Sequence, residues 1–297
     1  MIAYLTYLIL KGFSFFINLL PEGPSLWLGR QLGWMAFHLD REHRKVALEN
    51  LSTAFDREKS DQEKYAIAGR VFRNLGMNAV EFFRMPRMDV EAFKRRVVVE
   101  GLDRAQRALE GKRGILLLLS HFGNWELMGF MSKVTGHPIM VIAKPMKNKW
   151  VDRWVTGIRM RTGLEVIPAE KAGRKVIRAL SQNRVVGILI DQRAKRSEGV
   201  WADFFGKKAP TTPALAVLAM KTGAPVLPVF MIRNGHGKHR LLVKEPIPLT
   251  HTGDIKKDVE ANTQRLNRTV ESMVREYPDQ WFWVHRRWER RKRVHKR

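Results

Sequence analysis

The sequence predicts an α/β fold with a mostly parallel central sheet that is flanked by helices. Short apolar runs of strand length alternate with longer segments whose apolar residues recur at helical spacing, as do Tyr65, Ala68 and Phe72. An apolar fraction of 44% in 297 residues is enough for a large buried core. One apolar run, 115–119, ends in polar residues, which is typical of the ligand-binding edge of such a sheet.

The first 20 residues are predicted to form a membrane anchor or an interfacial helix. Lys11 is their only charged residue, and five of them are aromatic. They lack the basic start and the small-residue cleavage site of a secretory signal. About 20 apolar residues are needed to cross a bilayer, and Lys11 lies in mid-span, so shallow insertion is favoured over full crossing. The alternative is an apolar helix that is buried against the domain.

The rest of the chain, 21–297, is predicted to form a single domain. Its three parts are a helical elaboration over 21–95, an α/β core over 96–280 and an aromatic and basic tail over 281–297. In the stretch 21–39, Trp27 and Trp34 suit a lipid–water interface and equally suit a helix packed on the core.

The expected elements follow from apolar periodicity and from the Gly and Pro residues that interrupt it. A charged stretch, 40–45, marks a break before the later helices. The expected helices then cover 46–55, 61–83, 101–110, 125–134, 149–161, 172–182, 214–222 and 254–277. The expected strands cover 97–99, 115–119, 138–143, 164–167, 185–190, 226–232 and 240–243. The Gly-rich residues 234–237 make the last two strands candidates for a hairpin.

Composition restricts the chemistry. Lys and Arg number 54 against 29 Asp and Glu, a net charge of +25 that attracts nucleic acid, anionic lipid, phosphorylated substrates or an acidic carrier protein. The absence of Cys excludes disulfides, a thiolate nucleophile and a Cys-based metal site. No paired-His metal motif and no Gly-rich nucleotide-binding motif is found, so neither a metal nor a nucleotide cofactor is expected.

His121 and Glu126 are the first candidates for catalysis. His121 follows the run 115–119, and Asn124, which we expect to support the site, opens the helix that holds Glu126 in its first turn. Because His121 lies in the loop, Glu126 can accept a hydrogen bond from one imidazole nitrogen and fix the tautomer. The other nitrogen is then free to act as a general base towards a hydroxyl group. By itself, a histidine near a glutamate is a weak signal.

The segment from His121 to Glu126 resembles the His-(four residues)-Asp/Glu motif of the glycerolipid and lipid A acyltransferase superfamily. Further stretches and the hydrophobic N-terminus extend the resemblance over nearly the whole chain, to the late acyltransferases of lipid A biosynthesis, which transfer lauroyl, myristoyl or related chains. These stretches are Arg159-Met160-Arg161, Ile190-Asp191-Gln192, Phe204-Phe205-Gly206 and Gln280 to Trp288. The chain is also similar to the mycobacterial phosphatidylinositol mannoside acyltransferases. The resemblance implies a glycerolipid acyltransferase-like fold.

The resemblance also implies roles for single residues. His121 would deprotonate an acceptor hydroxyl, and Glu126 would orient His121. The hydroxyl would attack an acyl thioester directly, which agrees with the absence of Cys and of a Gly-x-Ser-x-Gly motif. Arg161, or its neighbour Arg159, would form with Asp191 a polar network that supports the acceptor site. An ordinary ion pair between a helix and a loop is the alternative.

Other residues are candidates by position. Loop N–H groups near Gly123 could stabilise an oxyanion, and Lys144, after the strand 138–143, could bind phosphate. Phe204, Phe205 and Trp201 are candidates for an acyl groove, although core packing explains them equally well.

The C-terminal stretch from Trp281 combines aromatic and basic residues. Such a combination suits an anionic membrane surface or RNA, and the plain alternative is a solvated tail. Within it, His285-Arg286-Arg287 could meet anionic head groups or simply cap the fold.

Taken together, these features predict a membrane-associated O-acyltransferase at the cytoplasmic face of the inner membrane. The donor would be an acyl thioester of acyl carrier protein or of CoA, and the acceptor a Kdo-bearing lipid A precursor. An anionic carrier protein and an anionic glycolipid account for the charge of +25, so nucleic acid is not an expected partner. The alternatives are acylation of another glycolipid, such as a phosphatidylinositol mannoside or an ornithine-type lipid, and, in a different class, non-enzymatic binding of polyanions or membranes.

Overall fold

The structure, a computed structural model, describes residues 1–235 and 237–289. Its α-helices are α1 (Ile2–Leu19), α2 (Glu22–Leu39), α3 (Arg41–Phe55), α4 (Asp61–Arg84), α5 (Val90–Lys94), α6 (Leu102–Glu110), α7 (Met131–Thr135), α8 (Lys149–Arg161), α9 (Ala172–Ser181), α10 (Ala214–Thr222) and α11 (Ile255–Glu276). Short 3₁₀ helices are η1 (Met85–Arg87), η2 (Trp125–Phe130) and η3 (Ala169–Lys171). The strands are β1 (Val97–Glu100), β2 (Ile115–Leu119), β3 (Ile139–Ala143), β4 (Leu164–Pro168), β5 (Val185–Leu189), β6 (Val200–Phe204), β7 (Lys207–Thr211), β8 (Val226–Arg233) and β9 (His239–Val243).

Seven strands form the central sheet in the order β1-β9-β8-β2-β5-β3-β4. The strands β8 and β9 pair antiparallel, as the hairpin prediction requires, and the other neighbouring strands pair parallel. The prediction of a mostly parallel α/β sheet flanked by helices is therefore confirmed. A separate antiparallel pair, β6 and β7, was not predicted, because its strands are short and interrupted by charged residues and Pro210.

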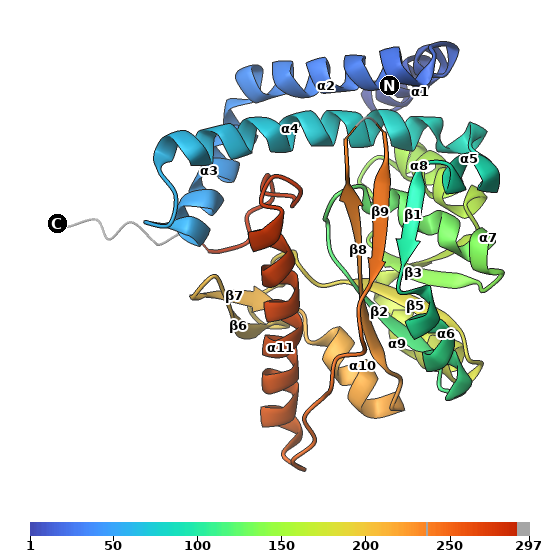
Figure 1. Ribbon diagram of the computed structural model, residues 1–297, viewed down its shortest axis with the longest axis vertical. Coiled ribbons are helices and arrows are strands. Elements are labelled where there is room, and N and C mark those ends of the chain that lie inside the picture. Colours follow the sequence, from blue (N-terminus) through green and yellow to red (C-terminus); the bar gives the residue numbers. More distant parts are fainter. Residues whose placement is uncertain (236, 290–297) are drawn as a thin grey trace.

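Alternate side chains of β2 enter two different cores. Leu116 and Leu118 pack in a cluster that includes α9, α10 and α11, whereas Ile115 and Leu119 pack in a second cluster with α5, α7 and α8. Figure 1 shows α10 and α11 on one side of the sheet and α6 and α7 on the other. A strand that is buried on both faces reads as a continuous apolar run, which is why β2 could be located from sequence.

Two predicted segments differ in detail. The charged stretch 40–45 was expected to be a break, but α3 already begins at Arg41, because the Asp40 carboxylate accepts a hydrogen bond from the N–H of His43 and caps the helix. The segment predicted as one helix over 125–134 begins as the 3₁₀ helix η2 and continues as α7. Gly129 lowers helix propensity in that segment and lets Thr162 approach its backbone.

The helices α1, α2 and α4 form a layer over the edge of the sheet at which β2, β5 and β8 end (Figure 1). The glycines of α2 and α4 allow close contact, since a Cβ atom at Gly33 would lie 2.2 Å from the carbonyl oxygen of Phe72. The stretch 21–39 thus packs on the domain, as one of its two alternatives predicted, and exposes Trp27 and Trp34, so that an interfacial position stays a prediction.

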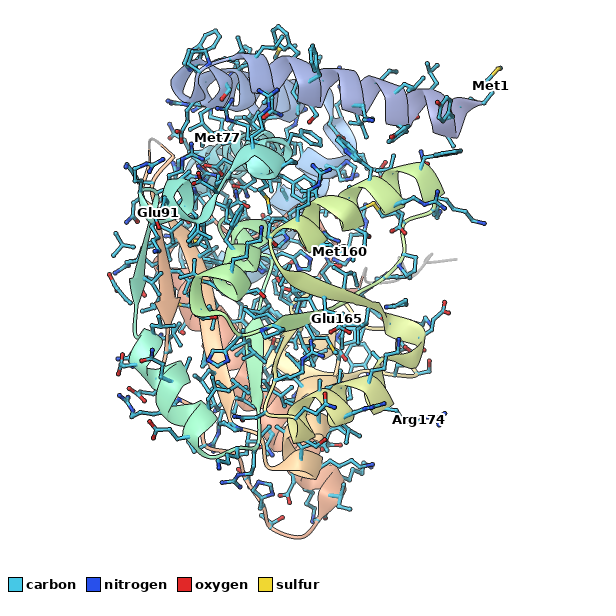
Figure 2. The ribbon with its side chains drawn as sticks, turned by 90° about the vertical axis from the view of Figure 1, so that its right-hand side faces the viewer. Met1, Met77, Glu91, Met160, Glu165 and Arg174 are labelled. Atoms are coloured by element: carbon cyan, nitrogen blue, oxygen red, sulfur yellow. The ribbon has the colours of Figure 1, made fainter. Side chains whose placement is uncertain are left out.

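The N-terminal helix α1 is long and apolar enough to cross a membrane, yet one of its faces rests on the domain. The Arg84 guanidinium donates hydrogen bonds of 2.8 Å to the carbonyls of Ile17 and Leu20, and the rings of Tyr7 and Trp154 meet edge to face. Figure 2 shows α1 running from Met1 above α8, which ends beyond Met160. Most of the remaining surface of α1 is exposed, so the helix remains a candidate membrane anchor.

The three tryptophans of the C-terminal stretch belong to the core and not to a surface. Trp281, Trp283 and Trp288 are buried. Arg287 is fully buried and donates to the carbonyl of Pro210 at 2.9 Å and to Thr211 Oγ1 at 2.6 Å. Of the two roles considered for residues 285–287, Arg287 therefore has the capping one. The basic residues 290–297 lie outside the described residues.

Candidate active site

The register of the sheet brings His121 and Asp191 together. The strands β2 and β5 are adjacent and parallel, with Leu119 opposite Leu189. His121 and Asp191 each follow two residues later, so they lie side by side at the carboxyl edge. The imidazole Nδ1 is 2.8 Å from Asp191 Oδ1, and the backbone N–H of His121 donates to Asp191 Oδ2 at 2.8 Å.

Asp191 is buried, and its carboxylate is well supported. The indole N–H of Trp281 donates a third hydrogen bond to Oδ2, at 2.8 Å. Burial alone would raise the pKa of Asp191, but the imidazole and N–H of His121 and the indole of Trp281 together hold this pKa below its usual value. An ionised Asp191 accepts from Nδ1–H, which leaves Nε2 of His121 as the basic nitrogen. Nε2 lies 3.2 Å from the amide nitrogen of Gln192.

The predicted pairing of His121 with Glu126 is wrong in this structure. The Glu126 carboxylate instead makes a bidentate pair with Arg159 of α8, with distances of 2.9 Å to Nε and 2.5 Å to Nη2. Burial alone would lower the pKa of Arg159, but the adjacent Glu126 raises it above its usual value. Arg161 lies on the exposed end of α8, so the predicted Arg161–Asp191 network is also wrong. Asp191 thus has the histidine partner that was expected for Glu126, and Glu126 has an arginine partner of the kind that was expected for Asp191.

An apolar cavity of about 500 Å³ opens beside this pair, and we call it the donor cavity, after the role that is proposed for it under Proposed function. Its walls come from one face of β2, β3 and β5 and from η2 and α7, and they include Leu117, Leu119, Met128, Met131, Ile139, Val141 and Leu189. Its polar lining consists of His121, Glu126, Lys144, Arg159 and Gln192. Lys144 thus lies at the site as predicted by position.

The aromatic residues expected in an acyl groove lie elsewhere. Phe204 and Phe205 are buried in the core, where Phe204 contacts Trp281 and Trp288, so the packing alternative is correct for them. Trp201 is exposed on β6 beneath the guanidinium of Arg196. From sequence alone, a phenylalanine of a short strand that is buried in the core cannot be distinguished from one that lines a groove.

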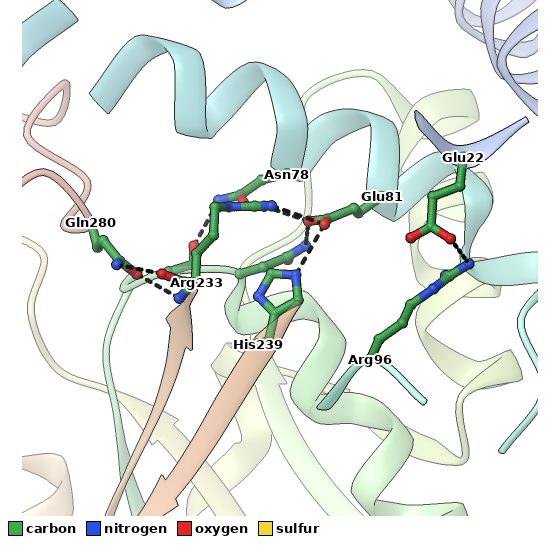
Figure 3. A network of polar contacts seen from close by, with 9 residues as sticks. Glu22, Asn78, Glu81, Arg96, Arg233, His239 and Gln280 are labelled. Atoms are coloured by element: carbon green, nitrogen blue, oxygen red, sulfur yellow. Dashed lines mark hydrogen bonds and ion pairs between the residues drawn. The ribbon is translucent and has the colours of Figure 1, made fainter. Parts of the chain in front are cut away.

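A buried polar network fixes the loop that carries His121 (Figure 3). Asn124 donates to Glu81 Oε2 at 2.6 Å, and Asn78 donates to the carbonyl of Gly123 at 2.6 Å. Arg233 donates to Glu81 Oε1 at 2.9 Å, and His239 Nε2 lies 3.0 Å from the same oxygen. The network ties α4 and the β8–β9 pair to the loop, so Asn124 supports the site through Glu81.

Glu81 is a supporting residue that the sequence did not reveal. Its carboxylate is buried, and burial would raise its pKa, but the charges of Arg233 and His239 hold the pKa well below its usual value. A single carboxylate within a long amphipathic helix gives no sequence signal of this role.

Two of the loop N–H groups near Gly123 already have acceptors within the protein. The N–H of Gly123 donates to the carbonyl of Gln280 at 2.7 Å, and the N–H of Phe122 donates to Ser120 at 2.8 Å. The predicted oxyanion role is therefore excluded for the N–H groups of Phe122 and Gly123. Gly123 is required for space, since its φ is +55° and an added Cβ atom would lie 1.6 Å from the carbonyl of Met231. The side chains of Gln192, Arg159 and Lys144 remain as donors at the cavity.

Two aromatic rings flank the imidazole and were not among the predicted site residues. The ring centroids of Trp125 and Phe282 lie 5.1 Å and 5.8 Å from that of His121. The N–H of Phe282 also donates to the carbonyl of His121 at 3.0 Å. The C-terminal aromatic stretch thus reaches the site from a distant part of the chain, and only the fold shows this.

Comparison with known proteins agrees with this geometry. A family model described as bacterial lipid A biosynthesis acyltransferase matches residues 1–290. A lipid A biosynthesis palmitoleoyltransferase of Escherichia coli is 28% identical over 92% of this chain and 87% of its own length. A lauroyltransferase of the same pathway and organism is 27% identical over 94% and 90%. A phosphatidylinositol mannoside acyltransferase of Mycolicibacterium smegmatis is 30% identical over 70% and 67%. The chain is therefore an acyltransferase and belongs to the bacterial lipid A biosynthesis acyltransferase family.

Proposed function

We propose that the protein is a membrane-associated O-acyltransferase that moves a fatty acyl chain from a thioester to a hydroxyl group of a glycolipid. The observation that carries the proposal is the His121–Asp191 pair at the mouth of an apolar cavity of about 500 Å³. The pair supplies an oriented base, and the cavity supplies a dry site for a hydrocarbon chain.

In the proposed reaction, Nε2 of His121 takes the proton of the acceptor hydroxyl while Asp191 accepts from Nδ1–H. The acceptor oxygen attacks the thioester carbon and forms a tetrahedral intermediate. This intermediate then expels the thiolate, which recovers the proton from the imidazolium, so that an ester and a free thiol result. The acceptor hydroxyl binds at Nε2, beside the Gln192 amide, whose nitrogen lies 3.2 Å from Nε2.

The charge that develops on the thioester oxygen needs a donor. Gln192 and Arg159 line the cavity next to His121, and we assign this role to them. The bidentate contact with Glu126 holds the Arg159 guanidinium in one orientation. This arrangement gives Glu126 an indirect role, in which it positions an oxyanion donor and not the base.

For the substrates, we propose acyl carrier protein as the carrier of the thioester and a Kdo-bearing lipid A precursor as the acceptor. The relatives named as lipid A acyltransferases support the acceptor, and the net charge of +25 favours two anionic substrates. We further propose that the enzyme acts at the cytoplasmic face of the inner membrane. The relative from Mycolicibacterium smegmatis favours a phosphatidylinositol mannoside as the second candidate acceptor.

Mass spectrometry of the lipids from a strain that lacks the protein tests the proposal. We expect the loss of one acyl chain from lipid A, and its restoration by the wild-type gene but not by His121→Ala. Purified protein with lauroyl-acyl carrier protein, or with lauroyl-CoA, then identifies the donor. Unchanged lipid A together with an under-acylated phosphatidylinositol mannoside would move the assignment to the second acceptor. Full activity of His121→Ala would refute the mechanism.

A further inference from the structure

A second apolar cavity lies between α1, α2 and α4, and we call it the helical groove. It encloses about 410 Å³. Leu32 and Ala36 of α2 and Leu75 and Ala79 of α4 form its walls, together with Phe13 of α1. Asp40 and His43, at the corner between α2 and α3, are the polar residues in its lining. An open cavity with such a lining favours an apolar occupant.

Phe282 joins the helical groove to the catalytic histidine. The Phe282 side chain lines the groove, while its ring centroid lies 5.8 Å from that of His121 and 5.7 Å from that of Trp125. His121 and Trp125 in turn line the donor cavity. The rings of Phe282, His121 and Trp125, which contact one another, therefore lie where the two apolar cavities approach each other.

Among the described residues, most of the exposed large hydrophobic side chains lie on α1 and α2, two of the helices that form the groove. Phe15 and Phe16 of α1 and Trp27 and Trp34 of α2 are exposed. Leu32 is both partly exposed and part of the groove lining. An apolar surface rich in aromatic residues is suited to the lipid–water interface, so the groove continues this surface towards the site.

We infer that the helical groove holds a hydrocarbon chain of the acceptor lipid while the transferred chain occupies the donor cavity. The inference rests on the proposed function. Transfer between two lipid-like substrates requires two apolar chains to be bound at once, with the base between the reacting groups. A helix from a partner protein fits poorly, because two turns of helix about 10 Å wide would fill roughly 850 Å³, against about 410 Å³ here.

Photochemical labelling tests the inference without turnover. The probe is a dodecyl glycoside with a diazirine in its chain, in vesicles of phosphatidylethanolamine and phosphatidylglycerol. We expect labelled peptides from α4 around Ala79 as well as from the outer faces of α1 and α2. Ala79→Phe fills the groove, so it should abolish the α4 label and keep the outer label. Ala66→Phe is the matched control, since Ala66 is exposed on α4 but outside the groove, and its labelling should equal that of wild type.

Labelling confined to the outer faces of α1 and α2 in the wild type would overturn the inference, as would an unchanged α4 label in Ala79→Phe. Ala36→Leu provides a second, smaller obstruction from α2, and circular dichroism checks that each variant is folded. In acyl-transfer assays, both groove variants should raise KM for the lipid acceptor and leave KM for the acyl thioester as in wild type. Equal increases in the two KM values would also contradict the inference. If the wild type is labelled on α4 but acylates no glycolipid, the proposed function fails, and the groove binds a hydrocarbon chain that is not that of an acceptor.

Discussion

The side chain of Asp191 holds both the ring and the backbone of His121, with distances of 2.8 Å to Nδ1 and 2.8 Å to the backbone nitrogen. One carboxylate therefore fixes the ring tautomer and the position of the loop together. Trp281 completes the arrangement by donating to the same carboxylate at 2.8 Å. This two-point attachment makes Asp191, and not Glu126, the residue that orients the base.

Asp191→Asn tests this assignment. The amide keeps the size of the side chain but does not hold a charged acceptor against Nδ1–H, so we expect kcat to fall by about 10²–10⁴-fold. Steady-state acyl transfer measures kcat, and circular dichroism shows whether the buried substitution is tolerated. Asp103→Asn, on the exposed face of α6, is the control and should keep wild-type kcat. A folded Asp191→Asn enzyme with wild-type kcat would contradict the assignment.

A double-mutant cycle separates the two carboxylates. Glu126→Gln and Arg159→Gln remove the two ends of one bidentate pair, so their effects on kcat/KM should be non-additive by about 0.5–3 kcal/mol. Glu126→Gln and Asp191→Asn remove parts of different contacts and should combine nearly additively. Strong coupling in the second cycle and none in the first would restore Glu126 as the partner of His121.

The main sheet could be predicted because its strands are short apolar runs that end where polar residues begin. His121 and Asp191 even carry the signal of their contact, since each lies two residues beyond the end of its strand. That signal could not be used without the strand order, because the sequence does not show that β2 and β5 are neighbours. The choice between Glu126 and Asp191 depended on this order. The roles of Glu81 and Phe282 also depend on contacts between distant segments, which local patterns do not reveal.

The buried Glu81 network is expected to make stability depend on pH. Glu81→Gln leaves Arg233 without its charged partner, and we expect the free energy of unfolding at pH 7 to fall by about 3–5 kcal/mol. The folded pKa of Glu81 is lowered, so its charged form stabilises the fold above the unfolded pKa, about 4.3, and this stabilisation is lost as the pH falls below it. Urea unfolding between pH 7 and pH 3 should show the difference between wild type and variant narrowing below that value. A difference that stays constant over this range would show that Glu81 is not the titrating group.

Leu117 is expected to influence which acyl chain the enzyme transfers. It lines the donor cavity and also a third cavity, of about 250 Å³, which lies on the same face of the sheet under α6. Leu117→Phe adds bulk where the two cavities share a wall, so we expect kcat/KM to fall more for long acyl chains than for short ones. Leu117→Ala removes bulk from this shared wall and should shift the preference towards longer chains. Competition among acyl thioesters of different length, with products separated by mass spectrometry, measures both shifts. Because loss of stability would act on every donor alike, opposite shifts in the two variants are the result that identifies Leu117 as a determinant of chain length.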